Sequence, residues 1–357
     1  MNNQIGKIEE ENNDTNNIQN ILILKIFILI FIILYENLIF KYHCNKRKTF
    51  EFLIKHQFYD NSLINKTIDL DYENVNFAVI KRTSCPICGL LSIYIVYLGC
   101  IRKYLLQGFI PILELESYKN AINGFRVNPS NGNPWEYFFN QPFGYKYNDI
   151  KKKARNIKYI ECTGYEIRPN EDLFLKKQSN YYWYIMANKY IPIKGKIIRE
   201  SNNIIQNLFK GSKNVLGVLL RGTDYIAKKP PDHPIPPKIE VAIKDVKLLN
   251  NKNPYDWIFL ATEDIIIRKE FMSAIGIKVK YLLNKKEIFY NYTSKEYLAY
   301  NENIKSDLKF HKIYLLNIII LSKCLDFLAA QASGTIGAFV LTKGFRYFKV
   351  YNLGYYK

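Results

Sequence analysis

Short apolar runs alternate with longer segments of helical periodicity through most of this chain. Runs at 75–80 and 110–115 are apolar almost throughout, which is typical of strands buried on both faces. Between them lie a loop with a glycine and a helical segment that ends near residue 107. This order of strand, loop, helix and strand predicts a parallel sheet.

The C-terminal half repeats the alternation more regularly. Apolar runs predict four further strands, and helical segments separate them, including one that ends near residue 320. A helical stretch at about 182–209 leads into this half, and 129–144 forms an ordered loop rich in Pro, Asn, Gly and aromatic residues. The pattern predicts an α/β fold of two Rossmann-like domains, at 41–195 and 196–357. The four predicted strands are 215–220, 257–261, 279–282 and 327–330.

The N-terminal residues have a different character. Residues 1–20 are polar and Asn-rich, which predicts a disordered tail. Residues 21–40 are apolar and long enough to span a bilayer of about 30 Å, although an in-plane interfacial helix is the alternative. No small-residue cleavage site follows, so a removable signal peptide is not expected. Lys and Arg are in excess after this segment, which predicts a single-pass anchor with the catalytic part on the cytoplasmic face.

Charge and cysteine usage narrow the choice of partners. The formal net charge of +19 favours a partner that carries phosphates, or an anionic lipid surface. Zinc-finger, ribonucleoprotein and homeodomain patterns are absent from the sequence, so nucleic acid is not the expected partner. Of the six cysteines, Cys85 and Cys88 form a C-x-x-C without a second such pair. We expect them to be reduced in a turn; a zinc site or a redox dithiol is the alternative.

Three polar segments follow predicted strands of the C-terminal half, at what would be one edge of its sheet. An arginine at a strand end offers a fork of donors that fits a phosphate bidentately. Small residues at a helix start offer free N–H groups to an anion, and acids can accept from ribose hydroxyls. Together they predict a nucleoside diphosphate site. The residues are Arg221, Gly222 and Asp224 after the first strand, Glu263 and Asp264 after the second, and Ser333, Gly334 and Thr335 after the last.

These motifs resemble a known family. GVLLRGTDY with a following HPI, IFLATED, and LSKCLDFLAAQASGTIG are similar to the three motifs of the fucosyltransferase superfamily. RTSCPICGLLS, PWEYFFNQPFGY and GFRYFKVYNLGYY look like a bacterial surface-polysaccharide branch, and the resemblance covers about 75–356. It implies a GT-B-like fold with the donor site in the C-terminal domain. It also implies GDP-fucose as co-substrate, a glycan acceptor, and inversion with no metal and no further cofactor.

The chain departs from the family pattern near its arginine. Leu219 replaces a histidine and Gly222 replaces a second arginine, so Arg221 keeps the diphosphate role alone. Lys229 stands where relatives carry an acid proposed as the base. Asn317 stands where an aspartate reads guanine, which puts the base and the sugar in question.

Two residues near Lys229 replace the missing acid. His233 or Asp232 is the candidate general base. Trp135 and Glu136 are expected to line the acceptor cleft, although Trp135 equally fits a core position. The alternative function is a non-catalytic, membrane-tethered module that binds a nucleotide or an anionic polymer.

Overall fold

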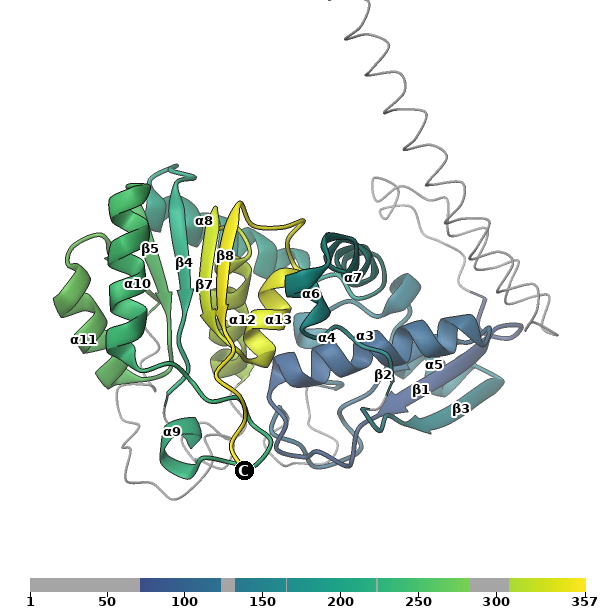
Figure 1. Cartoon of the computed structure of the whole chain (residues 1–357). Coiled ribbons are helices and arrows are strands. Elements are labelled where there is room, and N and C mark those ends of the chain that lie inside the picture. The colour runs from purple at the N-terminus through teal and green to yellow at the C-terminus, as the bar shows by residue number, and fades with distance from the viewer. Residues whose placement is uncertain (1–70, 123–131, 165, 223, 283–307) are drawn as a thin grey trace, which may run out of the picture.

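Two parallel β-sheets with helices packed on them make up the molecule (Figure 1). The computed structural model describes residues 71–122, 132–164, 166–222, 224–282 and 308–357. The expected tail at 1–20 and the expected membrane helix at 21–40 both lie outside these residues. Within them, no helix has the length and apolar character needed to cross a bilayer.

The first sheet has the strand order β2-β1-β3, and all its pairings are parallel. β1 (Asn76–Lys81) and β2 (Ile110–Leu113) flank helix α3 (Leu90–Leu106), as the sequence predicts. β3 (Asn156–Glu161) was not predicted, because it is an edge strand whose side chains are mostly exposed and polar. The three strands place the residues that follow β1 and β3 next to one another.

The second sheet has the order β6-β5-β4-β7-β8, again entirely parallel. Counted from β4, this is 3-2-1-4-5, the order of a Rossmann-type sheet, and the predicted α/β class with parallel sheets is confirmed. β8, rich in aromatic residues and partly exposed, was missed. The strands are β4 (Val215–Leu219), β5 (Trp257–Ala261), β6 (Val279–Lys280), β7 (Asp326–Ala330) and β8 (Tyr347–Tyr351).

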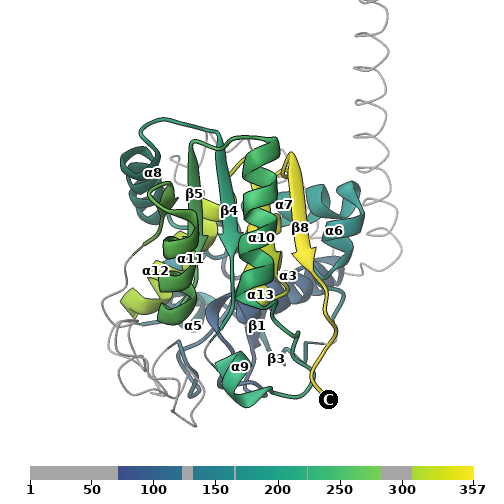
Figure 2. The same cartoon turned by 60° about the vertical axis from the view of Figure 1, so that its left-hand side comes forward.

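Helices cover both faces of the second sheet (Figure 2). Alternate side chains of β4 explain this, because Leu216 and Val218 pack with α10 (Ile239–Lys252) and α11 (Ile265–Ile275), whereas Val215 and Leu219 join the larger core. That core continues through α8 (Gly195–Phe209), α12 (Leu308–Leu321) and α13 (Ser333–Val340) into the first sheet.

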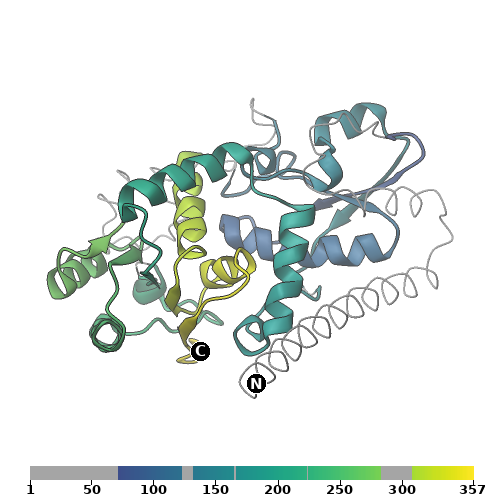
Figure 3. The same ribbon diagram turned by 90° about the horizontal axis from the view of Figure 1, so that it is seen from above.

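α13 packs against α3, so α12 and α13 lie between the two sheets (Figure 3). The residues that follow β4 and β7 therefore lie near the first sheet. The proposed division of the chain into 41–195 and 196–357 stays a prediction.

Two predicted segments have finer structure than expected. The helical stretch at 182–209 is two helices, α7 (Lys177–Tyr190) and α8, because Pro192 cannot continue α7. The loop at 129–144 contains short helices that begin at prolines. The remaining elements are α4 (Trp135–Phe138), η2 (Pro142–Gly144), α5 (Tyr147–Lys153), α6 (Asp172–Leu175) and α9 (Asp224–Lys228).

The cysteines differ from the prediction. Cys85 and Cys88 form a disulfide, and so do Cys100 and Cys162, which are 62 residues apart. The expectation that Cys85 and Cys88 are reduced was wrong, because the turn between them brings their Cα atoms to 5.4 Å. The second bridge forms because α3 brings Cys100 against the segment after β3, a proximity that sequence spacing does not reveal. Cys324 is buried and unbridged.

Candidate active site

The order of the second sheet reverses between β4 and β7. β5 and β6 lie on one side of β4, whereas β7 and β8 lie on the other. In open parallel sheets, ligands bind outside the carboxyl ends of the strands at this switch point. Arg221 follows β4 and Ser333 follows β7, so the structure brings these two predicted site segments to the switch point.

Arg221 lies beside one carboxylate and one aromatic ring. Its Nε lies 3.5 Å from Oε1 of Glu263, and its guanidinium carbon lies 4.5 Å from the centre of the Tyr225 ring. The Tyr225 ring in turn meets the His233 ring edge-on at 5.2 Å. Arg221 and His233 are therefore separated by one aromatic ring. Sequence reasoning did not select Tyr225, although it lies four residues after Arg221.

Glu263 and Asp264 have different roles. Glu263 accepts a hydrogen bond of 2.9 Å from the N–H of Gly222 in addition to its ion pair with Arg221, so it positions the strand end. Asp264 is buried and caps α11, because its Oδ1 accepts from the N–H groups of Ile266 and Ile267. In this geometry Asp264 caps a helix, whereas the sequence predicted that it would contact the nucleotide-sugar donor.

The sequence suggests that Gly222 lets a ligand approach the backbone closely, but the structure shows another requirement for glycine. A Cβ at this position would lie 2.0 Å from Oδ2 of Asp264, so the Asp264 carboxylate, not a ligand, occupies the space above the glycine. The same close approach leaves no room for a larger side chain at position 222.

The start of α13 presents backbone N–H groups. Its N-cap, Ala332, offers no side-chain cap, and the N–H groups of Ser333 and Gly334 precede the first helical hydrogen bond, which Thr335 donates to the carbonyl of Ala332. Ser333 is half-buried and Gly334 is buried. Thr335 is buried, and its hydroxyl donates to the carbonyl of Ala330, so it braces the loop instead of facing a ligand.

Tyr314 lies near both strand ends. A Cβ at Gly334 would lie 2.6 Å from the Tyr314 hydroxyl, so a larger residue there would displace the Tyr314 ring. Burial raises the pKa of Tyr314, and the nearby Arg221 opposes this effect. Tyr314 thus lies near both halves of the site, and its place inside an apolar helix gave no sequence signal.

The loop with His233 is held by the end of the chain. The N–H of Asp232 donates to the carbonyl of Tyr356, and the N–H of Tyr356 donates to the carbonyl of His233. Asp232 is exposed and has a φ of 59°, a conformation that aspartate tolerates better than most residues. His233 Nδ1 lies 2.9 Å from the carbonyl of Pro231. Because a carbonyl only accepts, Nδ1 carries the proton and Nε2 is left as an acceptor.

Two further donor-site predictions have less support. Asn317 is half-buried and lies one turn beyond Tyr314 on α12, but its amide donates to the carbonyl of Ile313 in the same helix. Asp224 begins α9, and its side chain lies outside the described structure.

The predicted acceptor-side pair is structural. Trp135 is fully buried and packs against Tyr94, Tyr97 and Phe139, so it belongs to the core and not to a cleft. Its aromatic neighbours come from α3 and from α4's own end, which sequence spacing could not reveal. Glu136 accepts from the Gln141 amide and from the N–H of Tyr147 and so braces this loop.

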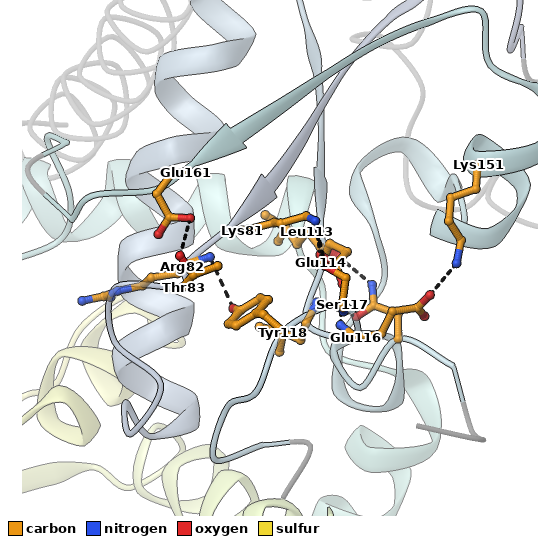
Figure 4. Close-up of polar contacts among 12 residues, drawn as sticks. Lys81, Arg82, Thr83, Leu113, Glu114, Glu116, Ser117, Tyr118, Lys151 and Glu161 are labelled. Atoms are coloured by element: carbon orange, nitrogen blue, oxygen red, sulfur yellow. Dashed lines mark hydrogen bonds and ion pairs between the residues drawn. The ribbon is translucent and has the colours of Figure 1, made fainter. Parts of the chain in front are cut away.

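A polar cluster at the carboxyl edge of the first sheet was not predicted (Figure 4). Glu114 is fully buried after β2; it accepts from two backbone N–H groups and lies 3.6 Å from Lys81. Glu116 pairs with Lys151, and Glu161 accepts from the Thr83 hydroxyl. Part of the signal was present in the sequence, because Lys81, Glu114 and Glu116 come at or just after the ends of the two predicted strands. Glu161 ends the unpredicted β3, and Lys151 lies on α5.

One grouping of metal-ligand residue types occurs in the described part of the chain. Cys100, Cys162 and Glu166 have their ligand atoms close together. The disulfide between the two cysteines uses both thiols, so this grouping does not offer thiolate ligands.

No protein-family model matches the sequence, and neither does any curated protein. Among solved structures, the chain is similar to NodZ α-1,6-fucosyltransferase soaked with GDP-fucose, at 13% identity and a TM-score of 0.40, over 75% of this chain and 93% of that chain. It is also similar to the fucosyltransferase NodZ from Bradyrhizobium, at 12% identity and a TM-score of 0.41, with 75% and 93% covered. POFUT1 in complex with GDP matches at 10% identity and a TM-score of 0.45, with 77% and 98% covered.

These matches name the same class of protein that the sequence motifs resemble. Identities of 10–13% and TM-scores of 0.40–0.45 carry no chemistry from those proteins to this chain. The chemistry therefore has to be argued from this chain's own residues.

Proposed function

We propose that the protein is a metal-independent, inverting glycosyltransferase of GT-B type that moves a sugar, fucose from GDP-fucose in the first instance, onto a glycan acceptor. The observation that carries this proposal is the pairing of Arg221 with the start of α13 at the switch point of a Rossmann-type sheet. A cation opposite a set of backbone N–H groups suits a diphosphate.

In this mechanism the bond between the sugar and the diphosphate breaks as the acceptor hydroxyl attacks from the opposite face. The transition state resembles an oxocarbenium ion, and negative charge builds up on the departing diphosphate. Arg221 and the N–H groups of Ser333 and Gly334 stabilise that charge. Glu263 positions Arg221 and the N–H of Gly222 at the end of β4.

The acceptor proton needs a base. His233 supports this role better than Asp232, because its Nε2 is the free acceptor and its ring lies beside Tyr225. The base takes the proton of the attacking hydroxyl, and the products are the glycoside with inverted configuration and GDP.

The test measures two quantities, the affinity for GDP by calorimetry and the rate of turnover of GDP-fucose. Arg221→Ala should weaken GDP binding by about 10- to 100-fold and abolish transfer, because a charge-assisted bidentate contact contributes about 1.5–3 kcal/mol. Arg199→Ala on α8 is the matched control, since Arg199 is exposed. Activity that is lost on EDTA treatment and restored by Mg²⁺ would contradict the metal-independent reaction.

One outcome separates the glycosyltransferase from the alternative function. GDP binding with no turnover of any GDP-sugar would favour the non-catalytic, membrane-tethered module.

Attachment through residues 21–40 with the catalytic part on the cytoplasmic face is a separate proposal, supported by the Lys and Arg excess after that segment. N-glycans on Asn65 or Asn291 would refute that orientation.

A further inference from the structure

The first sheet has a switch point of its own. β2 lies on one side of β1 and β3 on the other. The rule that places a ligand between β4 and β7 therefore points equally to the crevice outside the carboxyl ends of β1 and β3. Arg82 follows β1 directly, and the segment with Gly164 and Arg168 follows β3.

Two guanidinium groups meet at this crevice. A Cβ at Gly164 would lie 3.5 Å from Nη2 of Arg82 and 3.5 Å from Nη1 of Arg168, so both groups flank the same glycine. Among the described residues, neither Nε nor Nη1 of Arg82 has a hydrogen-bond partner, although both atoms are buried. A buried N–H donor without a hydrogen-bond partner is costly in free energy, because it has lost its hydrogen bonds to water and has gained none in the protein.

The neighbouring acids are already engaged. Figure 4 shows the Arg82 side chain extending away from Glu114 and Glu116, which bond elsewhere. Glu166, a carboxylate on the β3 side that also acts electrostatically on Arg82, accepts from Gly164 and Thr163 and lies 3.7 Å from Lys103. Burial lowers the pKa of Arg82, and the adjacent Arg168 lowers it further. Glu166 offsets the charge of Arg82 only in part, because it is shared with Lys103 and two hydrogen-bond donors, so the two arginines keep an excess of positive charge.

The segment after β3 also reaches the donor-site end of β7. The segment that carries Arg168 continues to Glu171, whose carboxylate accepts from Gln331 at the end of β7 and from Tyr355. Gln331 stands just before the start of α13. A group held at Arg82 and Arg168 is therefore on the acceptor side of the proposed diphosphate site.

We propose that Arg82 and Arg168 form an anion-binding site at the switch point of the first sheet, and that it holds a phosphate or carboxylate group of the acceptor. The acceptor is thus an acidic glycan. The placement of the anion site on the acceptor side rests on the proposed function, whereas the anion site itself rests on the two arginines alone.

The test measures binding of three sugars to the full-length protein saturated with GDP. Glucose 1-phosphate and glucuronate carry the two candidate anions, and glucose is the neutral control. At least one anionic sugar should bind about tenfold or more tightly than glucose, and the tighter one identifies the anion. Arg82→Gln should weaken that binding by about 10- to 100-fold. Arg168→Gln, at an exposed position that does not threaten the fold, should do the same.

Controls separate this site from the donor site. Lys269→Gln removes one exposed charge on α11 and should leave anionic sugar binding unchanged. GDP affinity should be unchanged in both arginine variants. Equal binding of charged and neutral sugars, binding retained in both variants, or loss only in Arg221→Ala would overturn the proposal. If GDP is not bound at all but the two arginines still select anionic sugars, the proposed function fails and the anion site stands.

Discussion

The Asp264 carboxylate occupies the space directly above Gly222. A Cβ on Gly222 would lie 2.0 Å from Oδ2 of Asp264, and the other carboxylate oxygen is held by two backbone N–H groups of α11. Asp264 cannot move aside without uncapping that helix. The carboxyl end of β4 and the start of α11 are therefore fixed against each other, next to Arg221.

Gly222→Ala tests this relationship. We expect a loss of about 1–3 kcal/mol in the free energy of unfolding from overpacking, with weaker GDP binding because Arg221 is displaced. Urea denaturation and calorimetry measure the two effects. Gly89→Ala is the matched control, because a Cβ there meets no atom within 4 Å. An unchanged unfolding midpoint in Gly222→Ala would contradict the packing described.

The two candidate bases should separate in kinetics. His233→Ala should lower turnover by about 10²–10⁴-fold with donor affinity unchanged, because a base acts on the acceptor hydroxyl and not on the diphosphate. Asp232→Ala serves as its neighbour control and should leave turnover near wild type, since Asp232 is exposed. Near-wild-type turnover in both variants means that this loop does not supply the base.

The disulfides should contribute unequally to stability. The Cys100–Cys162 bridge closes 62 residues and should contribute about 4 kcal/mol to the free energy of unfolding through the entropy of the unfolded chain. The Cys85–Cys88 bridge spans only 3 residues and should contribute about 1–2 kcal/mol. Double alanine variants of each pair, unfolded in urea without reductant, compare the two. Similar losses for both pairs would count against this account.

Acid should weaken the sheet through Asp326. Burial raises the pKa of this carboxyl, but hydrogen bonds from Arg346 and Tyr255 outweigh it and hold the pKa below its usual range. A lowered folded pKa contributes stability above the unfolded value of about 3.9, and this stability is lost as pH falls through the folded value. Asp326→Asn should cost about 1.5–3 kcal/mol at neutral pH.

The pH dependence distinguishes this effect from a general loss of packing. The difference in unfolding free energy between wild type and Asp326→Asn should shrink as pH falls below about 4. Thermal unfolding from pH 7 to pH 2.5 measures it. A difference that stays constant over this range would show that the carboxylate's charge does not matter.

Sequence patterns predicted the buried strands better than the exposed ones. β5 matched the expected range 257–261, because five apolar residues between polar neighbours leave little choice. β3 and β8 were missed, since edge strands carry charged and aromatic side chains that fit a loop equally well.

The site was predictable only in part. The positions of Arg221 and Ser333 could be predicted because both follow buried strands, and parallel strands bring their carboxyl ends together; their roles stay predictions. Asp264 and Thr335 were misjudged because the same polar atom can cap a helix or contact a ligand, and only the fold decides between them. Arg82 was overlooked because its partner, Arg168, is close only once β3 pairs with β1.

The pairing of β4 with β7 has a consequence for synthesis. β4 becomes the middle of the second sheet, yet β7 leaves the ribosome only after α9, α10, β5, α11, β6 and α12. Until then one edge of an apolar strand lacks its neighbour, and such an edge invites aggregation. The nascent chain therefore depends on protection, by a chaperone or by the earlier helices, for most of the time this half takes to emerge. A chain that stops before Asp326 would keep Arg221 and still have no switch point at which to use it.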